Sequence, residues 1–385
     1  MVLALAVPGP VRGEGGVLEI NHTCAVRTGC FPGDAPGYPV TIDGTAGRSY
    51  RLTSDLVVPE AATGIAVGAA NTSIDLAGFQ IVGPACAGVR GRCTVVQGAG
   101  FGISVGASLV DTGIGVSVRD GTVKGMGSTG VLLGALAEVK NVRVLWNGGR
   151  GMEVGSGSLV VDSGALENGR DGILARRGST VSGCRSFGNQ VAGITVYEGS
   201  TVTGNSVQSN GGSGIFALAN STVSNNTVDS NGRYGIHVEK GSTATGNSVR
   251  SSGDVGIRSP LSDGVTVTNN TSTNNGEEGI YVGPGSTVSG NTVAENGASG
   301  IYARQGSLVS GNTARANQGD GIYAEGASMV AGNTSYLNQG WGLRGANLAS
   351  YRDNQIVDNV GGTVIGAIVL LDLGGNSCNG NPSCP

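Results

Sequence analysis

One position of the sequence carries aromatic and cationic side chains at an almost constant spacing. It directly follows a Gly-Ile pair or a similar Gly-plus-apolar pair, and its occurrences lie 21 residues apart except for one step of 23. Along the chain it holds Phe216, His237, Arg258, Tyr281, Tyr302, Tyr323 and Arg344. Aromatic rings pack on the apolar faces of sugars, and arginine pairs with carboxylates. We call these seven residues the Phe216–Arg344 column and predict that it binds a polysaccharide or cell-surface glycan, with Arg304 contributing from the next outward position.

The same pattern also fits a purely structural interpretation. Identical side chains that stack along a β-solenoid stabilise it without any ligand. The sequence therefore leaves two interpretations of the column open, a binding strip and a stacking ladder.

One part of the column combines groups that could perform acid–base chemistry. His237 lies two residues before Glu239 and one repeat before Arg258. A polysaccharide lyase or epimerase needs a base and a group that neutralises a carboxylate. These three residues are the candidate catalytic set, although an ordinary surface histidine is the simpler interpretation. No metal site or cofactor is expected, and Ca²⁺ is a candidate cofactor only if the chain is a lyase.

The spacing indicates which elements position these side chains. Gly-plus-apolar pairs recur from Gly130-Val131 to Gly342-Leu343, and two series of Asn residues keep the same step. In Gly300 to Ala303, Ile301 and Ala303 point inward and Tyr302 outward if the segment is a strand. Asn tolerates the left-handed turn conformation, and its amide can form stacked hydrogen bonds. The sequence therefore predicts a parallel β-solenoid with three short strands and three corners per coil of about 21 residues.

Composition and charge exclude several other classes of protein. The 385 residues include 72 Gly, only 4% are aromatic and 13% are charged, but regular Val and Ile positions allow a core to form. The net charge is −4 with no basic run, so a nucleic-acid partner is not expected. No apolar run reaches the roughly 18 residues of a membrane span, so none is predicted.

Seven cysteines indicate an oxidising compartment. Six form close pairs, Cys24 with Cys30, Cys86 with Cys93 and Cys378 with Cys384, which we predict to be disulfides. Zinc is the alternative, but the spacing within each pair is wrong for a zinc knuckle. The seventh, Cys184, takes a position held by Asn in later repeats, and we expect a buried, unreactive thiol that forms no disulfide.

At this point the repeats resemble a known family. The units at 285–293 and 300–303 are similar to those of the pectate-lyase-like right-handed parallel β-helix superfamily, closest to its secreted bacterial members. The resemblance implies an all-β, right-handed parallel β-helix with disulfide-bonded ends. It implies no single activity, because this superfamily holds lyases, hydrolases, epimerases, adhesins and inert scaffolds. The motifs of polygalacturonase-like enzymes are absent, and Tyr234 to His237 matches only part of an epimerase-like motif.

These observations predict the following organisation. Residues 1–13 resemble the remnant of a signal peptide, 14–48 form an N-terminal cap, 49–360 form the β-helix with clear repeats from about 130, and 361–385 form a C-terminal cap. We expect a protein that is secreted to the extracellular space or cell surface, with the periplasm as an alternative. The leading hypothesis is polysaccharide binding without turnover. The alternatives are a lyase, epimerase or hydrolase acting on uronate-containing polymers, and a structural or adhesive surface protein that self-associates end to end.

Overall fold

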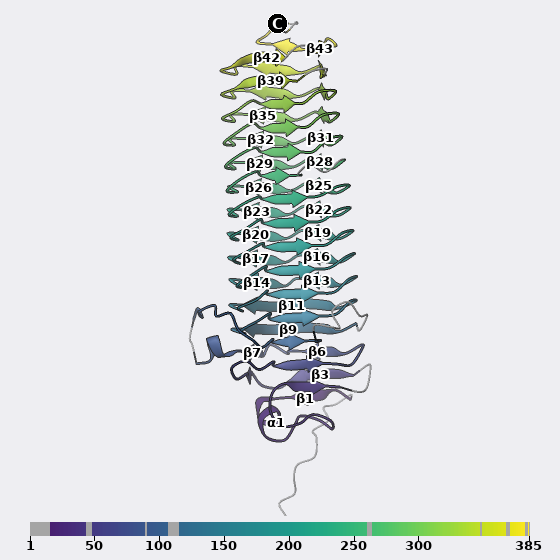
Figure 1. The fold of residues 1–385 in the computed structure, drawn as a ribbon, viewed down its shortest axis with the longest axis vertical. Coiled ribbons are helices and arrows are strands. Elements are labelled where there is room, and N and C mark those ends of the chain that lie inside the picture. Colours follow the sequence, from purple (N-terminus) through teal and green to yellow (C-terminus); the bar gives the residue numbers. More distant parts are fainter. Residues whose placement is uncertain are drawn as a thin grey trace, which may run out of the picture. The chain divides into compact units, whose positions relative to one another are not determined.

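The computed structural model describes residues 16–43, 48–88, 91–106, 115–259, 264–346, 349–366, 370–381 and 384. The predicted signal-peptide remnant, residues 1–13, lies outside the described residues. By its contacts the chain divides into two compact units, Met1–Arg176 and Arg177–Pro385. Each unit is a stack of parallel β-coils (Figure 1).

In the first unit a short helix, α1 (His22–Arg27), follows the first strand, and the coils vary in length. A single turn of 3-10 helix, η1 (Pro84–Cys86), follows β7. Its strands are β1 (Leu18–Ile20), β2 (Val40–Ile42), β3 (Ser49–Leu52), β4 (Leu56–Val57), β5 (Ile65–Val67), β6 (Ser73–Asp75), β7 (Gln80–Val82), β8 (Ile103–Ser104), β9 (Ser117–Lys124), β10 (Val131–Leu133), β11 (Glu138–Leu145), β12 (Met152–Val154), β13 (Leu159–Val161), β14 (Gly164–Leu166) and β15 (Ile173–Ala175).

The second unit repeats three short strands per coil, as the sequence predicts. Its strands are β16 (Thr180–Ser182), β17 (Arg185–Phe187), β18 (Ile194–Val196), β19 (Thr201–Thr203), β20 (Ser206–Gln208), β21 (Ile215–Ala217), β22 (Thr222–Ser224), β23 (Thr227–Asp229), β24 (Ile236–Val238), β25 (Thr243–Thr245), β26 (Ser248–Arg250), β27 (Ile257–Arg258), β28 (Thr266–Thr268), β29 (Thr271–Thr273), β30 (Ile280–Val282), β31 (Thr287–Ser289), β32 (Thr292–Ala294), β33 (Ile301–Ala303), β34 (Leu308–Ser310), β35 (Thr313–Arg315), β36 (Ile322–Ala324), β37 (Met329–Ala331), β38 (Thr334–Tyr336), β39 (Trp341–Gly345), β40 (Ser350–Arg352), β41 (Gln355–Val357), β42 (Gly362–Gly366), β43 (Leu371–Asp372) and β44 (Ser377–Cys378). The strands that follow the Gly-plus-apolar pairs, β18 to β42 in steps of three, form one parallel sheet, here called the Gly-Ile sheet.

The interior of each coil is narrow and apolar. Ile301 and Ala303 are fully buried while Tyr302 between them is not, which confirms the predicted alternation. Val288 and Val293 fill the same coil from its other two strands and are also fully buried. Burial of one such side chain contributes roughly 1.5–3 kcal/mol to the stability of the fold. A thin core is therefore enough to stabilise the solenoid when it is repeated along the axis.

Stacked asparagines at the corners of the second unit form hydrogen bonds with one another and with the backbone. In the first ladder, Nδ2 of Asn205 donates to Oδ1 of Asn226 at 2.9 Å, and Asn226 donates to Asn247 at 3.0 Å. The same oxygens accept the backbone N–H one coil earlier, so each buried amide is paired. The second ladder includes Asn231 and Asn275 but is interrupted between them by Ser252, whose buried Oγ has no hydrogen-bond partner.

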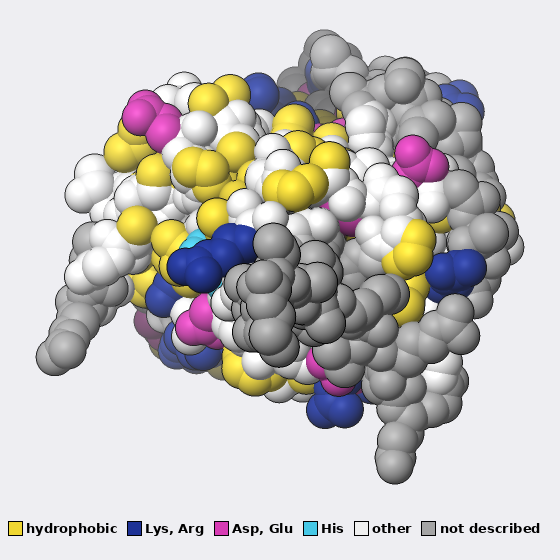
Figure 2. Space-filling view, turned by 90° about the horizontal axis from the view of Figure 1, so that it is seen from below, with side chains coloured by type: hydrophobic (Ala, Val, Ile, Leu, Met, Phe, Trp, Pro, Cys, Tyr) yellow, Lys and Arg dark blue, Asp and Glu magenta, His cyan; other side chains and the backbone are white. Residues whose placement is uncertain are grey.

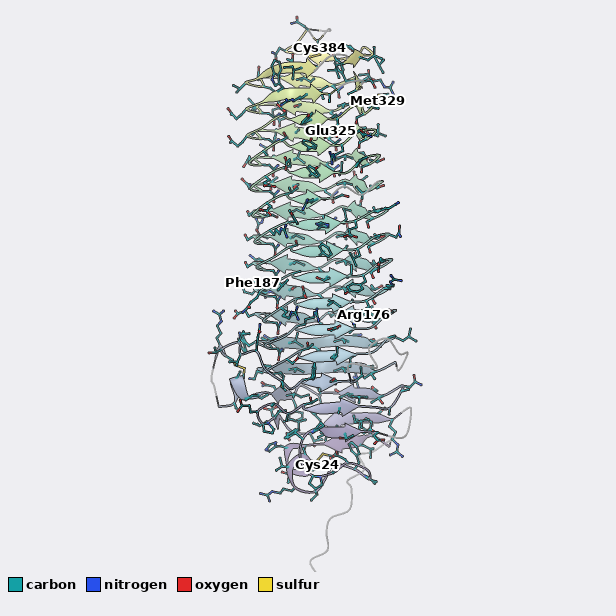
Figure 3. All side chains as sticks on the ribbon, viewed as in Figure 1. Cys24, Arg176, Phe187, Glu325, Met329 and Cys384 are labelled. Carbon is teal, nitrogen blue, oxygen red and sulfur yellow. A yellow bond between two sulfur atoms is a disulfide. The ribbon has the colours of Figure 1, made fainter. Side chains whose placement is uncertain are left out.

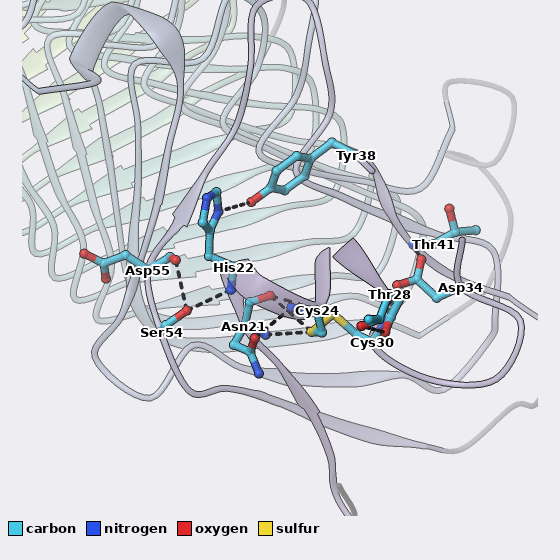
Figure 4. The surroundings of a disulfide bond; sticks show 11 residues. Asn21, His22, Cys24, Thr28, Cys30, Asp34, Tyr38, Thr41, Ser54 and Asp55 are labelled. Atoms are coloured by element: carbon cyan, nitrogen blue, oxygen red, sulfur yellow. Dashed lines mark hydrogen bonds between the residues drawn. A yellow bond between two sulfur atoms is a disulfide. The ribbon is translucent and has the colours of Figure 1, made fainter. Parts of the chain in front are cut away.

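The three predicted disulfides are all present. Cys24–Cys30 and Cys86–Cys93 lie in the first unit, and Cys378–Cys384 lies in the second. Around Cys24–Cys30, the Asn21 side chain accepts the backbone N–H of Cys24 and caps α1, while Asp34 accepts the N–H groups of Cys30 and Thr41, each at 2.8 Å (Figure 4). Cys184 lies outside these bonds and is buried, with 2% of its surface exposed.

The surface of the described residues is electrostatically mixed. Figure 2 looks onto the end of the structure drawn lowest in Figure 1, where apolar side chains lie among scattered cationic and anionic ones. Among the described residues, no helix has the length and apolar character needed to cross a membrane.

Candidate functional site

The strand register places the seven residues of the Phe216–Arg344 column in one continuous row on the Gly-Ile sheet. The pairs are Phe216–His237, His237–Arg258, Arg258–Tyr281, Tyr281–Tyr302, Tyr302–Tyr323 and Tyr323–Arg344. Adjacent strands lie about 4.8 Å apart, so six steps span about 29 Å. The 23-residue step between Arg258 and Tyr281 does not shift the register, because the two extra residues lie outside the strands.

The tyrosine half of the column is a ladder of ring contacts. Tyr281 and Tyr302 stack with their centroids 5.0 Å apart, and Tyr323 meets Tyr302 edge-on at 4.7 Å. The guanidinium of Arg344 lies over the Tyr323 ring at 5.0 Å. All three tyrosines are half-buried. These contacts agree with the interpretation of the column as a stacking ladder, and the partial exposure of the rings also leaves surface for a ligand.

Tyr302 is fixed by a carboxylate on the next coil. Its hydroxyl donates to Glu325 at 2.7 Å, and Nε of Arg304 lies 3.3 Å from the other oxygen of Glu325. Burial and the bond to Glu325 both raise the pKa of Tyr302 above its usual value. Figure 3 labels Glu325 among the side chains of these coils.

A flanking row of residues was not predicted from the sequence. Tyr234, Glu278, Asp320 and Trp341 each stand directly before a Gly-plus-apolar pair and so line the column on one side. Asp320 accepts the backbone N–H of Trp341 at 2.7 Å and forms an ion pair with Arg344 at 3.7 Å. The sequence signal that could have identified this row is the residue that precedes each Gly-plus-apolar pair, because it recurs with the same 21-residue step.

His237 differs from its expected position. The sequence suggested an ordinary surface histidine, but only 7% of His237 is exposed. The rings of Phe216 and Tyr234 cover it, with centroids 4.6 and 5.5 Å away, and its buried Nδ1 has no hydrogen-bond partner. Burial lowers the pKa of His237 to about 4, and the charges of Arg258 and Arg233 act in the same direction. The imidazole is therefore neutral at neutral pH.

Arg258 is held against Tyr234 rather than against a carboxylate. Its guanidinium lies 4.5 Å from the Tyr234 ring centroid, and Nη1 donates to the Tyr234 hydroxyl. Arg233 approaches the same ring at 4.7 Å. The predicted catalytic set is thus only partly assembled: His237 and Arg258 meet around Tyr234, but no hydrogen bond or ion pair joins Glu239 to either in the described part of the chain. Burial and the nearby Glu198 raise the pKa of Glu239.

The described residues offer no obvious metal centre. Within them, no group of three or more His, Cys, Asp or Glu side chains converges to hold an ion. The side chains of the column supply aromatic rings, phenolic hydroxyls, guanidinium groups and one imidazole.

Comparison with known proteins identifies the class to which this chain belongs. The family described as "right handed beta helix region" matches residues 101–245 and 240–381. The chain is a member of this right-handed β-helix family, which confirms the fold expected from the resemblance. No curated protein sequence matches the chain.

Several solved structures are similar. The Dettilon tailspike protein is 13% identical, with 71% of this chain and 60% of the tailspike covered and a TM-score of 0.50. The A-module of the mannuronan C-5 epimerase AlgE6 of Azotobacter vinelandii is 15% identical, with 86% and 90% covered and a TM-score of 0.45. The Agl-KA catalytic domain is 14% identical, with 96% and 69% covered and a TM-score of 0.46. At 13% identity, the likeness to the tailspike shows a shared fold.

Proposed function

We propose that the chain binds an extracellular or cell-surface polysaccharide along the Phe216–Arg344 column, without chemical turnover. The observation that carries this proposal is the unbroken register of the column, which presents one aromatic or cationic side chain per rung. A row of about 29 Å matches an extended polymer better than a small molecule. Its side chains are held by contacts with one another, so little side-chain entropy is lost on binding.

The state of His237 favours binding over turnover. A general base works best when its pKa lies near the working pH. The pKa of His237 is about 4, its ring is buried, and among the described residues no hydrogen bond or ion pair joins it to Glu239. These properties make His237 a poor proton acceptor at neutral pH.

Three disulfides are typical of proteins that fold outside the cytosol. Such a location agrees with a glycan ligand of the cell surface or the extracellular space. Secretion to one of these places is part of the proposal.

Affinity electrophoresis through gels that contain single polysaccharides tests the proposal. Replacing Tyr281, Tyr302 and Tyr323 together with Ala should abolish retention of the protein while its β-type circular dichroism persists. The matched control replaces Thr222, Thr243 and Thr266 with Ala, because these residues form an equally regular row on a different sheet. Unchanged retention of the tyrosine variant, or equal loss in the threonine control, would count against the column.

Turnover is the alternative, supported by the meeting of His237 and Arg258 around Tyr234. Incubation with pectin and alginate, followed by ultraviolet absorbance of unsaturated uronates and by NMR of the sugar residues, tests it. Product formed by the wild type and lost in His237→Ala would replace the binding proposal with a lyase or epimerase. Product retained by that variant would place the chemistry elsewhere.

A further inference from the structure

Three arginines lie on the candidate binding face, and their partners differ. Arg304 pairs with Glu325 at 3.3 Å, and Arg344 pairs with Asp320 at 3.7 Å. Arg258 forms no ion pair with any residue that the structure describes. A half-buried guanidinium without a counter-charge retains a strong preference for an anion.

The Arg258 side chain is nevertheless positioned. It lies over the Tyr234 ring and donates Nη1 to the Tyr234 hydroxyl. A guanidinium carries five N–H donors in a rigid fork, so donors remain after this single bond. Arg233 adds a second positive charge at the same ring, although Arg233 also forms an ion pair with Asp254 at 3.6 Å. Tyr234 therefore orients Arg258 without neutralising it.

An independent observation marks the same place. Nδ1 of His237, one rung from Arg258, is buried and has no hydrogen-bond partner. A buried polar group left unpaired costs about 1–3 kcal/mol, and a ligand that paired with it would recover part of that cost.

The repeat itself is also irregular here. The step from Gly256 to Gly279 is 23 residues, and β27 has two residues where the neighbouring strands of the Gly-Ile sheet have three. Departures from local rules concentrate at functional sites in proteins whose other repeats are regular.

We infer that Arg258, oriented by Tyr234 beside His237, binds an oxyanion, and that this oxyanion is a carboxylate or sulfate substituent of the bound glycan. The inference rests on the proposed function and specifies its ligand: an acidic polysaccharide whose charged sugar lies at Arg258 while the following sugars lie along Tyr281, Tyr302 and Tyr323. The carboxylate of Glu278, one coil further on, is the protein group that would compete with the glycan anion for Arg258. Burial raises the pKa of its carboxyl group, and Arg258 partly opposes this effect.

The test compares acidic polymers with their neutral counterparts. Wild type, Arg258→Gln and the matched control Arg250→Gln, whose arginine pairs with Asp229 on a different sheet, are run through gels containing polygalacturonate, its methyl ester, dextran sulfate or dextran. The wild type should be retained more strongly by at least one acidic polymer than by its neutral partner. Arg258→Gln should lose at least about tenfold in affinity for that polymer only, because a hydrogen bond to a charged group is lost. Arg250→Gln should lose much less, and Arg258→Lys should be intermediate, because it keeps the charge without the fork. Circular dichroism melts establish that each variant is folded.

The possible results separate the inference from the function on which it rests. If the wild type binds acidic and neutral polymers equally and Arg258→Gln binds as well as the wild type, the oxyanion site is wrong and polysaccharide binding stands. If no polymer retains the wild type, polysaccharide binding is wrong. Titration of the ¹⁵N-labelled protein with inorganic sulfate and with acetate then decides whether the Arg258 Nε–H resonance shifts. A shift at Arg258 that the Nε–H of Arg250 does not show would support a site for free anions and overturn the glycan as their source. No shift would overturn the site altogether.

Discussion

The hydroxyl of Tyr302 and the carboxylate of Glu325 are joined by a 2.7 Å hydrogen bond that crosses from one coil to the next. Glu325 also forms an ion pair with Arg304, so one carboxylate restrains both a ring of the column and the guanidinium beside it. The column is thus fixed from its flank as well as by stacking between its members.

Removing this bond should lower the stability of the protein. Tyr302→Phe keeps the stacked ring but leaves Glu325 without its phenolic donor, so the free energy of unfolding should fall by about 1–3 kcal/mol. Urea unfolding followed by circular dichroism measures the change. Tyr323→Phe is the matched control, because the Tyr323 hydroxyl makes no such bond within the described residues. An equal effect of both variants would show that the bond to Glu325 contributes little.

Acid should destabilise the protein through His237. The pKa of His237 is about 4 in the folded state against the ordinary histidine value of 6.5, so the unfolded chain binds a proton more readily. Stability should therefore fall as the pH drops from about 6.5 to about 4, by roughly 3 kcal/mol in total, and should not fall further from this cause below pH 4. His237→Phe, which keeps an aromatic ring beside Phe216, should remove this part of the pH dependence. Urea midpoints at pH 7, 5.5 and 4.5 give the comparison, and identical slopes in both proteins would contradict the assignment.

The gap in the second asparagine ladder should be repairable. Ser252 stands between Asn231 and Asn275, and its buried Oγ is unpaired. Ser252→Asn should restore the amide contacts and raise the free energy of unfolding by about 1 kcal/mol. The reverse change at an intact rung, Asn296→Ser, should lower it by about 1–3 kcal/mol. A destabilised Ser252→Asn variant would indicate that the irregular coil has no room for the amide.

Cys184 should react only after unfolding. It is buried, its backbone N–H donates to Oδ1 of Asn205 at 2.8 Å, and its Sγ lies 3.3 Å from the carbonyl oxygen of Ser182. Native protein should take up almost no maleimide, and denatured, unreduced protein should take up one equivalent. Rapid labelling of the native protein, or a disulfide-linked dimer that a reducing agent dissociates, would contradict this prediction and favour the end-to-end assembly hypothesis.

Much of the architecture could be predicted because a solenoid converts sequence spacing directly into spatial position. A constant step of 21 residues places Tyr281, Tyr302 and Tyr323 on adjacent rungs, and the same arithmetic located the asparagine ladders. The predicted boundaries at residues 48 and 360 stay predictions, because contacts between neighbouring coils look alike on both sides of them.

The spacing could not predict the conformations of the side chains on the surface of the coils. Whether Tyr234 covers His237, and whether Arg258 turns toward Tyr234 or toward an acid, depends on the torsions of long side chains and on the bulk of their neighbours. For the same reason the bond from Tyr302 to Glu325, which joins residues 23 positions apart, has no signature in the repeat.

Because the ladder asparagines of the second unit bond to their counterparts in the adjacent coil and to carbonyl groups at equivalent positions, a whole repeat could be duplicated or deleted without creating a new kind of contact. Each such event would lengthen or shorten the Phe216–Arg344 column by one rung. Descendants of a single ancestral gene could in this way vary the number of sugars they span while keeping the same chemistry at every step.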